Sequence, residues 1–209
     1  MKVDLNEQFF WELIERANIS DMPESYELDE HIDELTALLS ELDSGEMILF
    51  EMTLRKKINQ LNTVEIAELS MILENSFEEN EGVFDFDDYM STDGFIYFRC
   101  WLILRGKEFF YEIIEDINAF INGKYEFDIS DMWAEGLLYV TDLAFDAKYG
   151  QEDSSFVTDA VDDLYVEVVH YDLIETDWTR EPYTGTELQL HYPKLVMEIG
   201  ELRNEEEEE

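Results

Sequence analysis

The side chain most able to do chemistry in this sequence is Arg99, because it interrupts the apolar run Ser91–Phe110. If that run is a helix, a guanidinium within it must bond to carboxylates or backbone carbonyls, since a buried unpaired charge is costly. Asp93 lies too far along such a helix for an i,i+4 pair. We therefore expect a structural ion pair between Arg99 and a carboxylate on another element. The alternative is a helical ligand-binding or enzymatic domain in which Arg99 lies at a pocket and binds an anionic ligand.

The cysteine and the histidines give little support to nucleophilic or zinc chemistry. Cys100 lies in the same apolar run, where a free cysteine behaves as a small buried hydrophobic residue rather than as an activated thiolate. His31, His170 and His191 are far apart in the sequence, and none has the H-x-x-x-H spacing of a zinc site. The sequence predicts neither cysteine catalysis nor a zinc centre.

The aspartates that precede the apolar run could instead bind a divalent cation. Asp85–Ile96 begins like an EF-hand calcium loop, but its positions six and twelve hold Met90 and Ile96 in place of Gly and Glu. We expect an exposed acidic loop followed by a helix cap, and we assign no metal and no cofactor. The alternative is a weak site formed by Asp85, Asp87, Asp88 and Asp93.

Carboxylate pairs cannot be used to recognise an acid–base catalyst in this chain. Its 209 residues include 53 Asp and Glu, so every neighbourhood contains such pairs. The sequence has no phosphate-binding glycine-rich loop and no G-x-S-x-G nucleophile motif. We expect no enzymatic activity.

The acidity itself is the strongest signal of function. The 53 acids stand against 13 Lys and Arg, which gives a formal net charge of −40. This charge repels nucleic acid and anionic membranes, and it attracts basic protein surfaces from a distance. The expected partner is a basic protein, such as a nuclease or another nucleic-acid-binding effector, which the chain would neutralise as an immunity or anti-defence factor. The alternative is a halophilic housekeeping domain whose charge serves only solvation.

Two acidic segments form the candidate binding surface. Carboxylates spread along a rigid surface can occupy positions like those of DNA phosphates, and Tyr and Trp among them are favoured interface anchors. On a helix, Asp159, Asp162 and Asp163 would share one face. The candidate partner-binding residues are Glu78, Glu79, Glu81, Asp85, Asp87, Asp88, Asp159, Asp162, Asp163, Tyr171, Asp172, Asp177 and Trp178.

Cysteine content and hydropathy favour the cytoplasm. Cys100 is the only cysteine, so no intramolecular disulfide can form. Glu7, Glu12 and Glu15 occupy the region where a signal peptide needs a basic and then an apolar run. No apolar stretch reaches the roughly 18 residues of a membrane span. We expect a cytoplasmic protein that binds no membrane.

Helical periodicity accounts for most of the chain that must position these residues. In the first part it predicts four helices, the third introduced by a capping box at Asp43–Glu46 and carrying the basic cluster Arg55, Lys56 and Lys57. The segment Glu78–Met90 breaks the pattern and is typical of an acidic surface loop with room for a short extended piece. The four helices are capped by or begin at Asn6, Leu28, Asp43 and Thr63.

The later part is predicted to be helical too. Asp93 should cap the central helix, and Gly106 should end it in a left-handed conformation. A second apolar helix is expected over Lys107–Ile121, and a long one that Ser130 caps and Gly150 stops. Beyond it, periodicity favours a helix over Ser155–Val169, although Leu164–Leu173 also alternates like a β-strand.

The predicted fold class is mainly α. We expect a single compact multi-helix domain over residues 1–203, with an acidic central loop and a candidate short β element in the C-terminal third. Within it, residues 151–183 are a candidate insertion or extension. Residues 204–209 are a run of charge and are expected to form a disordered acidic tail.

Several blocks of the sequence are typical of one family. The most specific is DGFIYFRCWLILRGKEFF, Asp93–Phe110, and four others support it: Phe10–Ala17, Leu38–Glu51, Leu137–Gly150 and His191–Leu195. Through them the chain resembles the uncharacterised bacterial family known as domain of unknown function 4240. The resemblance implies a helical bacterial cytoplasmic domain, and it carries no activity and no catalytic residue. The acidic segment Glu78–Met90 and the region Gln151–Tyr183 depart from the family pattern.

Overall fold

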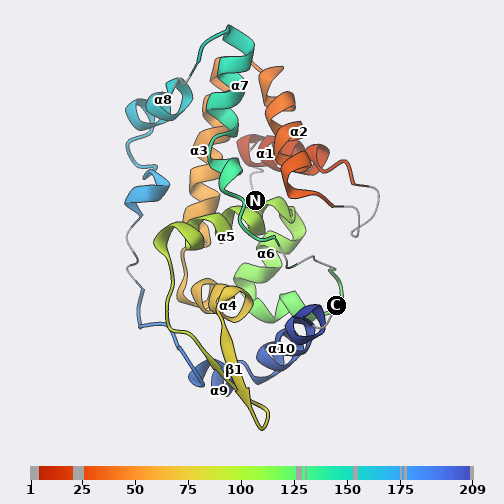
Figure 1. Ribbon diagram of the computed structural model, residues 1–209. Helices are drawn as coiled ribbons and strands as arrows, with labels where there is room; N and C mark the ends of the chain where they lie inside the picture. Colours follow the sequence, from red (N-terminus) through yellow and green to blue (C-terminus); the bar gives the residue numbers. More distant parts are fainter. Residues whose placement is uncertain are drawn as a thin grey trace.

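The protein is built mainly from helices, as the computed structural model in Figure 1 shows, so the mainly α prediction is confirmed. The structure describes residues 5–20, 26–125, 129, 131–152, 155–174, 176 and 178–207, and the side chains of these residues other than 5 and 204–207. The elements are α1 (Leu5–Ala17), α2 (Leu28–Ser40), α3 (Ser44–Gln60), α4 (Val64–Glu74), β1 (Phe77–Asn80), β2 (Val83–Phe86), α5 (Thr92–Leu104), α6 (Lys107–Glu115), the 3₁₀-helices η2 (Ile117–Ile121) and η3 (Glu135–Leu138), α7 (Val140–Tyr149), α8 (Phe156–Leu164), the 3₁₀-helix η4 (Tyr171–Leu173), α9 (Glu187–His191) and α10 (Pro193–Glu207).

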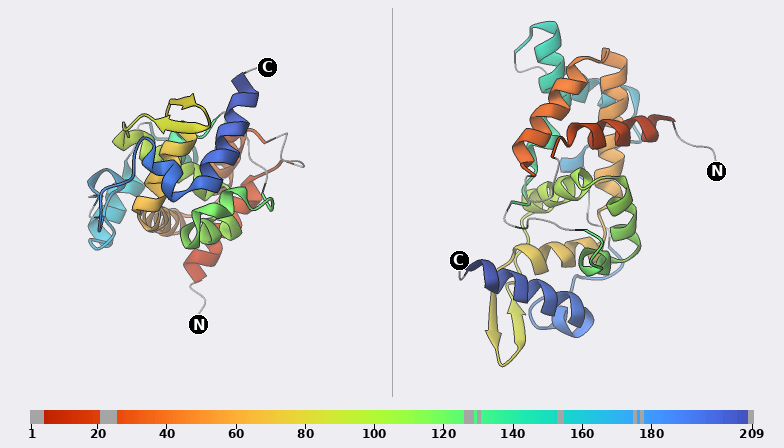
Figure 2. Two further views of the ribbon diagram at one scale, coloured as in Figure 1. Left: turned by 90° about the horizontal axis from the view of Figure 1, so that it is seen from below. Right: turned by 90° about the vertical axis from the view of Figure 1, so that its right-hand side faces the viewer.

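The helices form two groups on either side of the central pair α5 and α6. In Figures 1 and 2, α1, α2, α3, α7 and α8 lie on one side, whereas α4, the hairpin, α9 and α10 lie on the other. The buried apolar side chains of both groups join in one main cluster that runs from Phe10 in α1 to Ile199 in α10. Phe98 and Trp101 of α5 are fully buried within it. The apolar run around Arg99 is therefore the core helix of the fold.

Polar side chains fix the starts of the helices, partly as predicted. The capping box before α3 is confirmed, because Asp43 Oδ1 accepts from the Glu46 amide at 2.9 Å and Glu46 Oε2 accepts from the Asp43 amide at 3.0 Å. Thr63 caps α4 as expected. The cap of α5 was predicted wrongly. It is Ser91, whose hydroxyl accepts from the Gly94 amide at 3.3 Å, and Asp93 lies in the first turn.

The acidic segment after α4 begins with a β-hairpin, so the predicted loop is corrected up to Phe86, and the short extended piece that was considered there is a pair of strands. Its strands pair antiparallel, with Phe77 opposite Phe86 and Asn80 opposite Val83. The turn is Glu81–Gly82, with φ of 53° and 80°, and positive φ at both central residues is the requirement of a type I′ hairpin turn. In the described part of the chain these are the only strands, so the small sheet lies here and not in the C-terminal third.

The helix predicted over Lys107–Ile121 is interrupted. Asp116 is extended (φ −156°, ψ 115°), and its side chain accepts from the Asn118 amide at 2.9 Å, so α6 ends and η2 begins there. Gly106 has a positive φ of 93°, but its ψ of 169° is extended, and it forms the N-cap of α6 instead of a left-handed end to α5.

The long helix expected up to Gly150 consists of η3 followed by α7. Gly150 ends α7 in the left-handed conformation (φ 65°, ψ 39°), as predicted. Its expected cap, Ser130, lies outside the described residues.

The C-terminal region runs from α8 along one edge of the molecule to α9 and α10 (Figure 1). Residues Leu164–Leu173, which also alternated like a strand, form the end of α8, a turn and η4. Of the tail expected to be disordered, residues 204–207 continue α10 and residues 208–209 lie outside the described part. Leu195, Val196 and Ile199 of α10 belong to the main core cluster, so this region packs on the same core as the rest.

Candidate functional site

The acidic side chains of the hairpin all lie at the surface. Glu78 and Asp85 are directly opposite each other on its outward face, and like charges in that position destabilise a hairpin. No Lys or Arg occurs from residue 58 to residue 98. Nor does any cation of the described residues form an ion pair with Glu78 or Asp85. The exposed acids of this segment, as predicted, are Glu78, Glu79, Glu81, Asp85, Asp87 and Asp88.

An aromatic inner face holds the hairpin on α10. Phe77 packs against Phe84 and Phe86 with ring centroids 5.2 and 5.4 Å apart. Gly200 of α10 provides the space for this contact, since a Cβ there would lie 2.5 Å from the Phe84 ring. The Arg203 guanidinium lies 4.7 Å from the Phe77 ring centroid. The acids are therefore displayed on a packed support.

A single amide side chain fixes the strip between the hairpin and α5. Asn75 Nδ2 donates to the backbone carbonyls of Asp87 and Tyr89 at 2.7 and 2.9 Å. The Asp87 amide also donates to the Ser76 carbonyl at 2.9 Å, which extends the pairing beyond the strands. Asp87 and Asp88 are thus exposed on a strip whose backbone is held in place.

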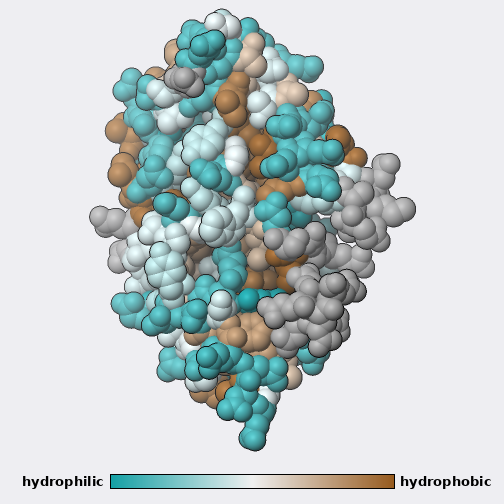
Figure 3. All heavy atoms as spheres, viewed as in Figure 1, coloured by the Kyte–Doolittle hydropathy of each residue, from teal (hydrophilic) through white to brown (hydrophobic). Residues whose placement is uncertain are grey.

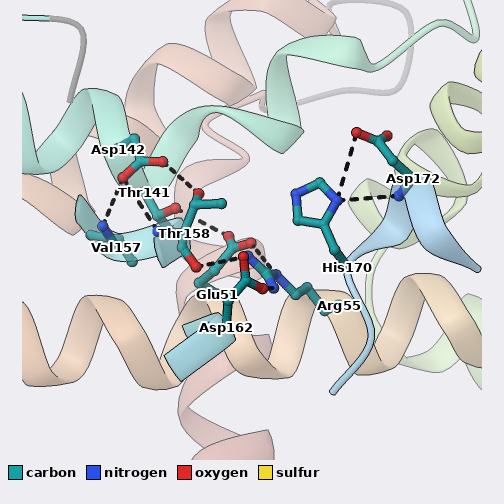
Figure 4. Close-up of polar contacts among 9 residues, drawn as sticks. All are labelled: Glu51, Arg55, Thr141, Asp142, Val157, Thr158, Asp162, His170 and Asp172. Atoms are coloured by element: carbon teal, nitrogen blue, oxygen red, sulfur yellow. Dashed lines mark hydrogen bonds and ion pairs between the residues drawn. The ribbon is translucent and has the colours of Figure 1, made fainter. Parts of the chain in front are cut away.

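The second acidic segment is α8, where Asp159, Asp162 and Asp163 are exposed as predicted. Asp162 is not free for a partner, because it forms an ion pair with the guanidinium of Arg55 in α3 (Figure 4). Its side chain is 50% exposed, whereas that of Arg55 is fully buried. One of the three predicted acids therefore anchors the helix, and the other two face solvent.

A buried polar cluster lies beneath α8. Arg55 Nε donates to Glu51 Oε1 at 2.8 Å and Arg55 Nη2 donates to the Thr158 carbonyl at 3.1 Å, while the Thr141 hydroxyl donates to Glu51 Oε2 at 3.1 Å. Burial works to lower the pKa of Arg55, but its bonds to Glu51 and Asp162 outweigh burial and raise that pKa. Burial raises the pKa of the Glu51 carboxyl, although the bonds from Arg55 and Thr141 act to lower it. Figure 4 shows how α3, α7 and α8 converge on this cluster.

The start of α8 is fixed by α7. Asp142 Oδ1 accepts from the Val157 amide at 2.8 Å, and Asp142 Oδ2 accepts from the Thr158 hydroxyl. An acidic side chain from another helix thus supplies the cap that no neighbouring residue provides.

The predicted aromatic anchors are turned inward. Tyr171 is only 7% exposed and belongs to the main core cluster. Trp178 is half-buried, packs edge-on against Phe95, and donates from its indole nitrogen to the Asn62 carbonyl at 3.3 Å. Both residues attach the C-terminal region to the core, so the prediction that they anchor a partner is corrected.

Two further predicted residues complete the second segment. Asp172 is exposed, and its amide donates to His170 Nδ1 at 3.3 Å (Figure 4). Burial and the nearby charge of Arg55 lower the pKa of His170. Asp177 lies outside the described residues.

Arg99 is structural, but without the predicted ion pair. It is 3% exposed, and it donates to the carbonyls of Phe95 at 3.1 Å and of Ile58 in α3 at 3.1 Å. Its guanidinium also lies 4.5 Å from the Phe95 ring centroid. No carboxylate of the described residues forms an ion pair with Arg99. The last turn of α3, whose carbonyls have no partner within the helix, supplies the Ile58 carbonyl as an acceptor. Burial lowers the pKa of Arg99 to about 10.

A second buried carboxylate, Glu68 in α4, was not foreseen from the sequence. It is fully buried, accepts from Arg180 Nη2 at 2.8 Å and from the Tyr183 amide at 2.7 Å, and also accepts from the Tyr192 hydroxyl. The bond to Glu68 raises the pKa of Arg180. These partners are more than 100 residues away from Glu68, so no local pattern could reveal them.

The described residues contain no arrangement suited to the metal, thiol or anion-pocket chemistry considered from the sequence. No group of three or more His, Cys, Asp or Glu among them could hold a metal ion. Cys100 is fully buried, and burial raises the pKa of its thiol. Two surface hollows of about 600 and 260 Å³ are formed around α6 and η2 and around the start of α6, and Arg99 lines neither. No described helix combines the length and the apolar character that crossing a membrane requires.

One family matches this chain. Residues 5–147 match the family described as protein of unknown function, DUF4240. The chain belongs to the DUF4240 family. No curated protein and no solved structure matches it. The resemblance noted from the sequence blocks is thereby confirmed.

The end of the DUF4240 match divides the polar clusters. Arg55 and Glu68 lie within residues 5–147, whereas their partners Asp162 and Arg180 lie after it. The region beyond the match is therefore joined to the family region by two buried charges.

Proposed function

We propose that the protein is a non-catalytic acidic binding protein that neutralises a basic protein partner in the cytoplasm. The partner class that fits best is a nuclease or another nucleic-acid-binding effector, because such proteins present cationic grooves that carboxylates can fill in place of phosphates. In this proposal the chain acts as an immunity or anti-defence factor.

The observation that carries the proposal is the uncompensated pair Glu78 and Asp85 on the outward face of the hairpin. A directly opposed like-charge pair costs stability, and a guanidinium or ammonium placed between the two carboxylates would remove that cost. Exposed Asp87 and Asp88 continue the charge along a fixed strip. The hairpin needs no rearrangement to receive a cationic surface.

The state of Arg99 favours this proposal over a ligand-binding or enzymatic alternative. An arginine that reads an anionic ligand must present its guanidinium to a pocket, but Arg99 is 3% exposed and bonds to backbone carbonyls. Cys100 next to it is fully buried. Neither residue can reach a substrate without opening the core.

The test is an affinity capture from the lysate of the native host, with and without phage infection, using the full chain as bait and washes at 50 mM and 500 mM NaCl. We expect one stoichiometric basic protein that is retained at low salt and lost at high salt. The hairpin variant Glu78→Gln, Asp85→Asn, Asp87→Asn, Asp88→Asn should slow its association at least tenfold and flatten the salt dependence.

The matched control removes four exposed charges elsewhere: Asp29→Asn, Glu30→Gln, Asp33→Asn and Glu41→Gln on and after α2. Equal effects of the two variants would mean that total charge, and not the hairpin, drives association. A bait that retains nothing, or retains many proteins without stoichiometry, would overturn the proposal.

A further inference from the structure

The segment that begins at the end of α8 presents apolar side chains that the protein leaves uncovered. Leu164, Val166, Val169 and Leu173 are 65%, 85%, 47% and 70% exposed. Figure 3 shows hydrophobic atoms along the left edge of the molecule, where α8 and this segment lie in Figure 1. We call these four residues the apolar ledge. Scattered exposed apolar residues are normal, but four within ten residues of the chain are a local concentration of the kind that occurs at interaction sites.

The segment that carries the apolar ledge packs against α3. Val161, which precedes the ledge, and Val168, which lies between Val166 and Val169, are buried against Met52 of α3. The backbone between them is closed by the bonds from the Tyr165 amide to the Val161 carbonyl at 2.9 Å and from the Val168 amide to the Tyr165 carbonyl at 2.7 Å. The exposure of the ledge is therefore a property of an ordered surface.

Carboxylates surround the ledge. Asp163 directly precedes Leu164, Glu167 and Asp172 lie between the apolar residues, and all three acids are exposed. From residue 149 to residue 179 the chain has nine acids and no Lys or Arg. An occupant must therefore combine an apolar face with positive charge at its margins.

We propose that the apolar ledge is the docking site of a cationic amphipathic helix belonging to the protein partner. Apolar side chains of that helix would cover Leu164, Val166 and Leu173, and flanking Lys and Arg would lay their stems on the ledge and their charges on Asp163 and Glu167. A second copy of this chain, with its own charge of −40, and an anionic bilayer are both repelled by the same rim. The inference rests on the proposed function and adds a second contact, distant from the hairpin in Figure 1.

The location of the ledge adds to this inference. It follows residue 147, where the match to the DUF4240 family ends, so it belongs to the part of the chain that the family match does not cover. Partner choice by the ledge would then be a property of this chain's C-terminal region, with the family region as its support.

Site-specific fluorescence tests the proposal. Cys100 is fully buried, so a Val166→Cys variant can be labelled at residue 166 with a polarity-sensitive bimane dye. The probe is an 18-residue Lys/Leu peptide that folds as an amphipathic helix, and the comparison peptides are a scrambled Lys/Leu sequence and a Lys/Ser sequence of equal charge. We expect a saturable blue shift with the amphipathic peptide only. Leu190→Cys, at a position 77% exposed on α9, should show none.

Calorimetry with unlabelled variants separates the ledge from general charge attraction. The variant Leu164→Ser, Val166→Ser, Leu173→Ser keeps every carboxylate, and it should bind the amphipathic peptide at least tenfold more weakly. The matched control Ile19→Ser, Leu190→Ser, Leu202→Ser changes three other exposed apolar residues and should stay within twofold of the native protein.

The outcomes distinguish the two proposals. Equal affinity for the amphipathic and scrambled peptides, or equal effects of the two serine variants, would overturn the docking site and leave the proposed function standing. Failure of all three cationic peptides to bind at 50 mM NaCl would count against the proposed function itself and the docking site with it.

Discussion

Arg55 is the residue on which the polar cluster beneath α8 depends. Glu51 and Arg55 are both fully buried, and breaking such a pair from one side costs about 3–5 kcal/mol because the other charge stays uncompensated. Arg55→Met should therefore lower the free energy of unfolding by about 3–5 kcal/mol, measured by urea denaturation. It should also weaken the attachment of α8 to α3, to which the bonds from Arg55 to Asp162 and to the Thr158 carbonyl contribute.

Asp162→Asn is the comparison for this prediction. Its side chain is 50% exposed, so water replaces the lost charge and the expected loss is about 1 kcal/mol or less. If Asp162→Asn destabilised the protein as much as Arg55→Met, the buried Glu51 would not be the cause of the loss.

Glu74 should make stability depend on pH. Burial raises its pKa to about 7 from the ordinary 4.5, even though the Trp133 indole donates to its carboxylate at 2.7 Å. The native state therefore binds more protons than the unfolded state between these values. The stability contributed by protonated Glu74 is fully present below pH 4.5 and is lost as pH rises through 7.

Glu74→Gln tests this dependence, because glutamine keeps an acceptor for Trp133 and imitates the neutral acid. The variant should match the native protein near pH 4.5 and be more stable by about 2 kcal/mol above pH 7.5, at 1.36 kcal/mol per pKa unit with a discount for partial exposure. Thermal unfolding followed at both pH values measures the difference. A gain of equal size at both pH values would disprove the assignment.

Among the elements, the contact between the hairpin and α10 depends on Gly200. A Cβ at this position would lie 2.5 Å from the Phe84 ring, so the ring or the helix would have to move. Gly200→Ala should cost about 1–3 kcal/mol through overpacking, although alanine by itself favours a helix by about 1 kcal/mol. Denaturant unfolding measures the loss.

A double-mutant cycle with Phe84→Leu isolates this contact. If the clash is the cause, the smaller side chain should recover at least about 0.5 kcal/mol of the loss caused by Gly200→Ala. Additive losses would place the cause elsewhere in α10.

At the level of elements, periodicity predicted α1 to α5 well, because the spacing of apolar residues shows which face of a helix is buried. The caps of α3 and α4 were predicted correctly, whereas that of α5 was not. The hairpin escaped prediction because its turn is Glu81–Gly82, whereas Asn-Gly or Asp-Gly is the usual signal. The alternating phenylalanines of β2 were the signal that could have found it. The break at Asp116 was missed for a similar reason, since an aspartate can terminate a helix with its own side chain.

The candidate surface was predictable only in part. Exposure of Asp85, Asp87 and Asp88 follows from charge, which is a local property. The inward positions of Tyr171 and Trp178 follow from contacts with residues far away in the chain, such as Asn62 and Phe95. Periodicity contains no information about such contacts, so these two side chains were assigned to the wrong side of the surface.

Over the whole molecule, the buried acids form ion pairs within the fold, whereas exposed acids face solvent. The two fully buried acids Glu51 and Glu68 each have a guanidinium partner, and the Glu68 pair and the Arg55–Asp162 bond connect the region after residue 147 to the core. Glu78 and Asp85 of the hairpin form no ion pair with any described residue. Exposed acids such as Glu78 and Asp85 are thus accessible to a partner, whereas the buried acids hold parts of the fold together.

That distribution predicts opposite effects of salt on stability and on binding. Screening of self-repulsion should raise the free energy of unfolding between 20 and 300 mM NaCl by about 1 kcal/mol, or about 2–4 °C in Tm for a chain of this size. Over the same range, binding of the Lys/Ser peptide should weaken, because screening removes the attraction that drives it. Thermal unfolding and calorimetry in one salt series measure both. A halophilic domain would instead be unfolded at 20 mM and require molar salt, and a chain whose binding does not respond to salt would have no functional use for its exposed charge.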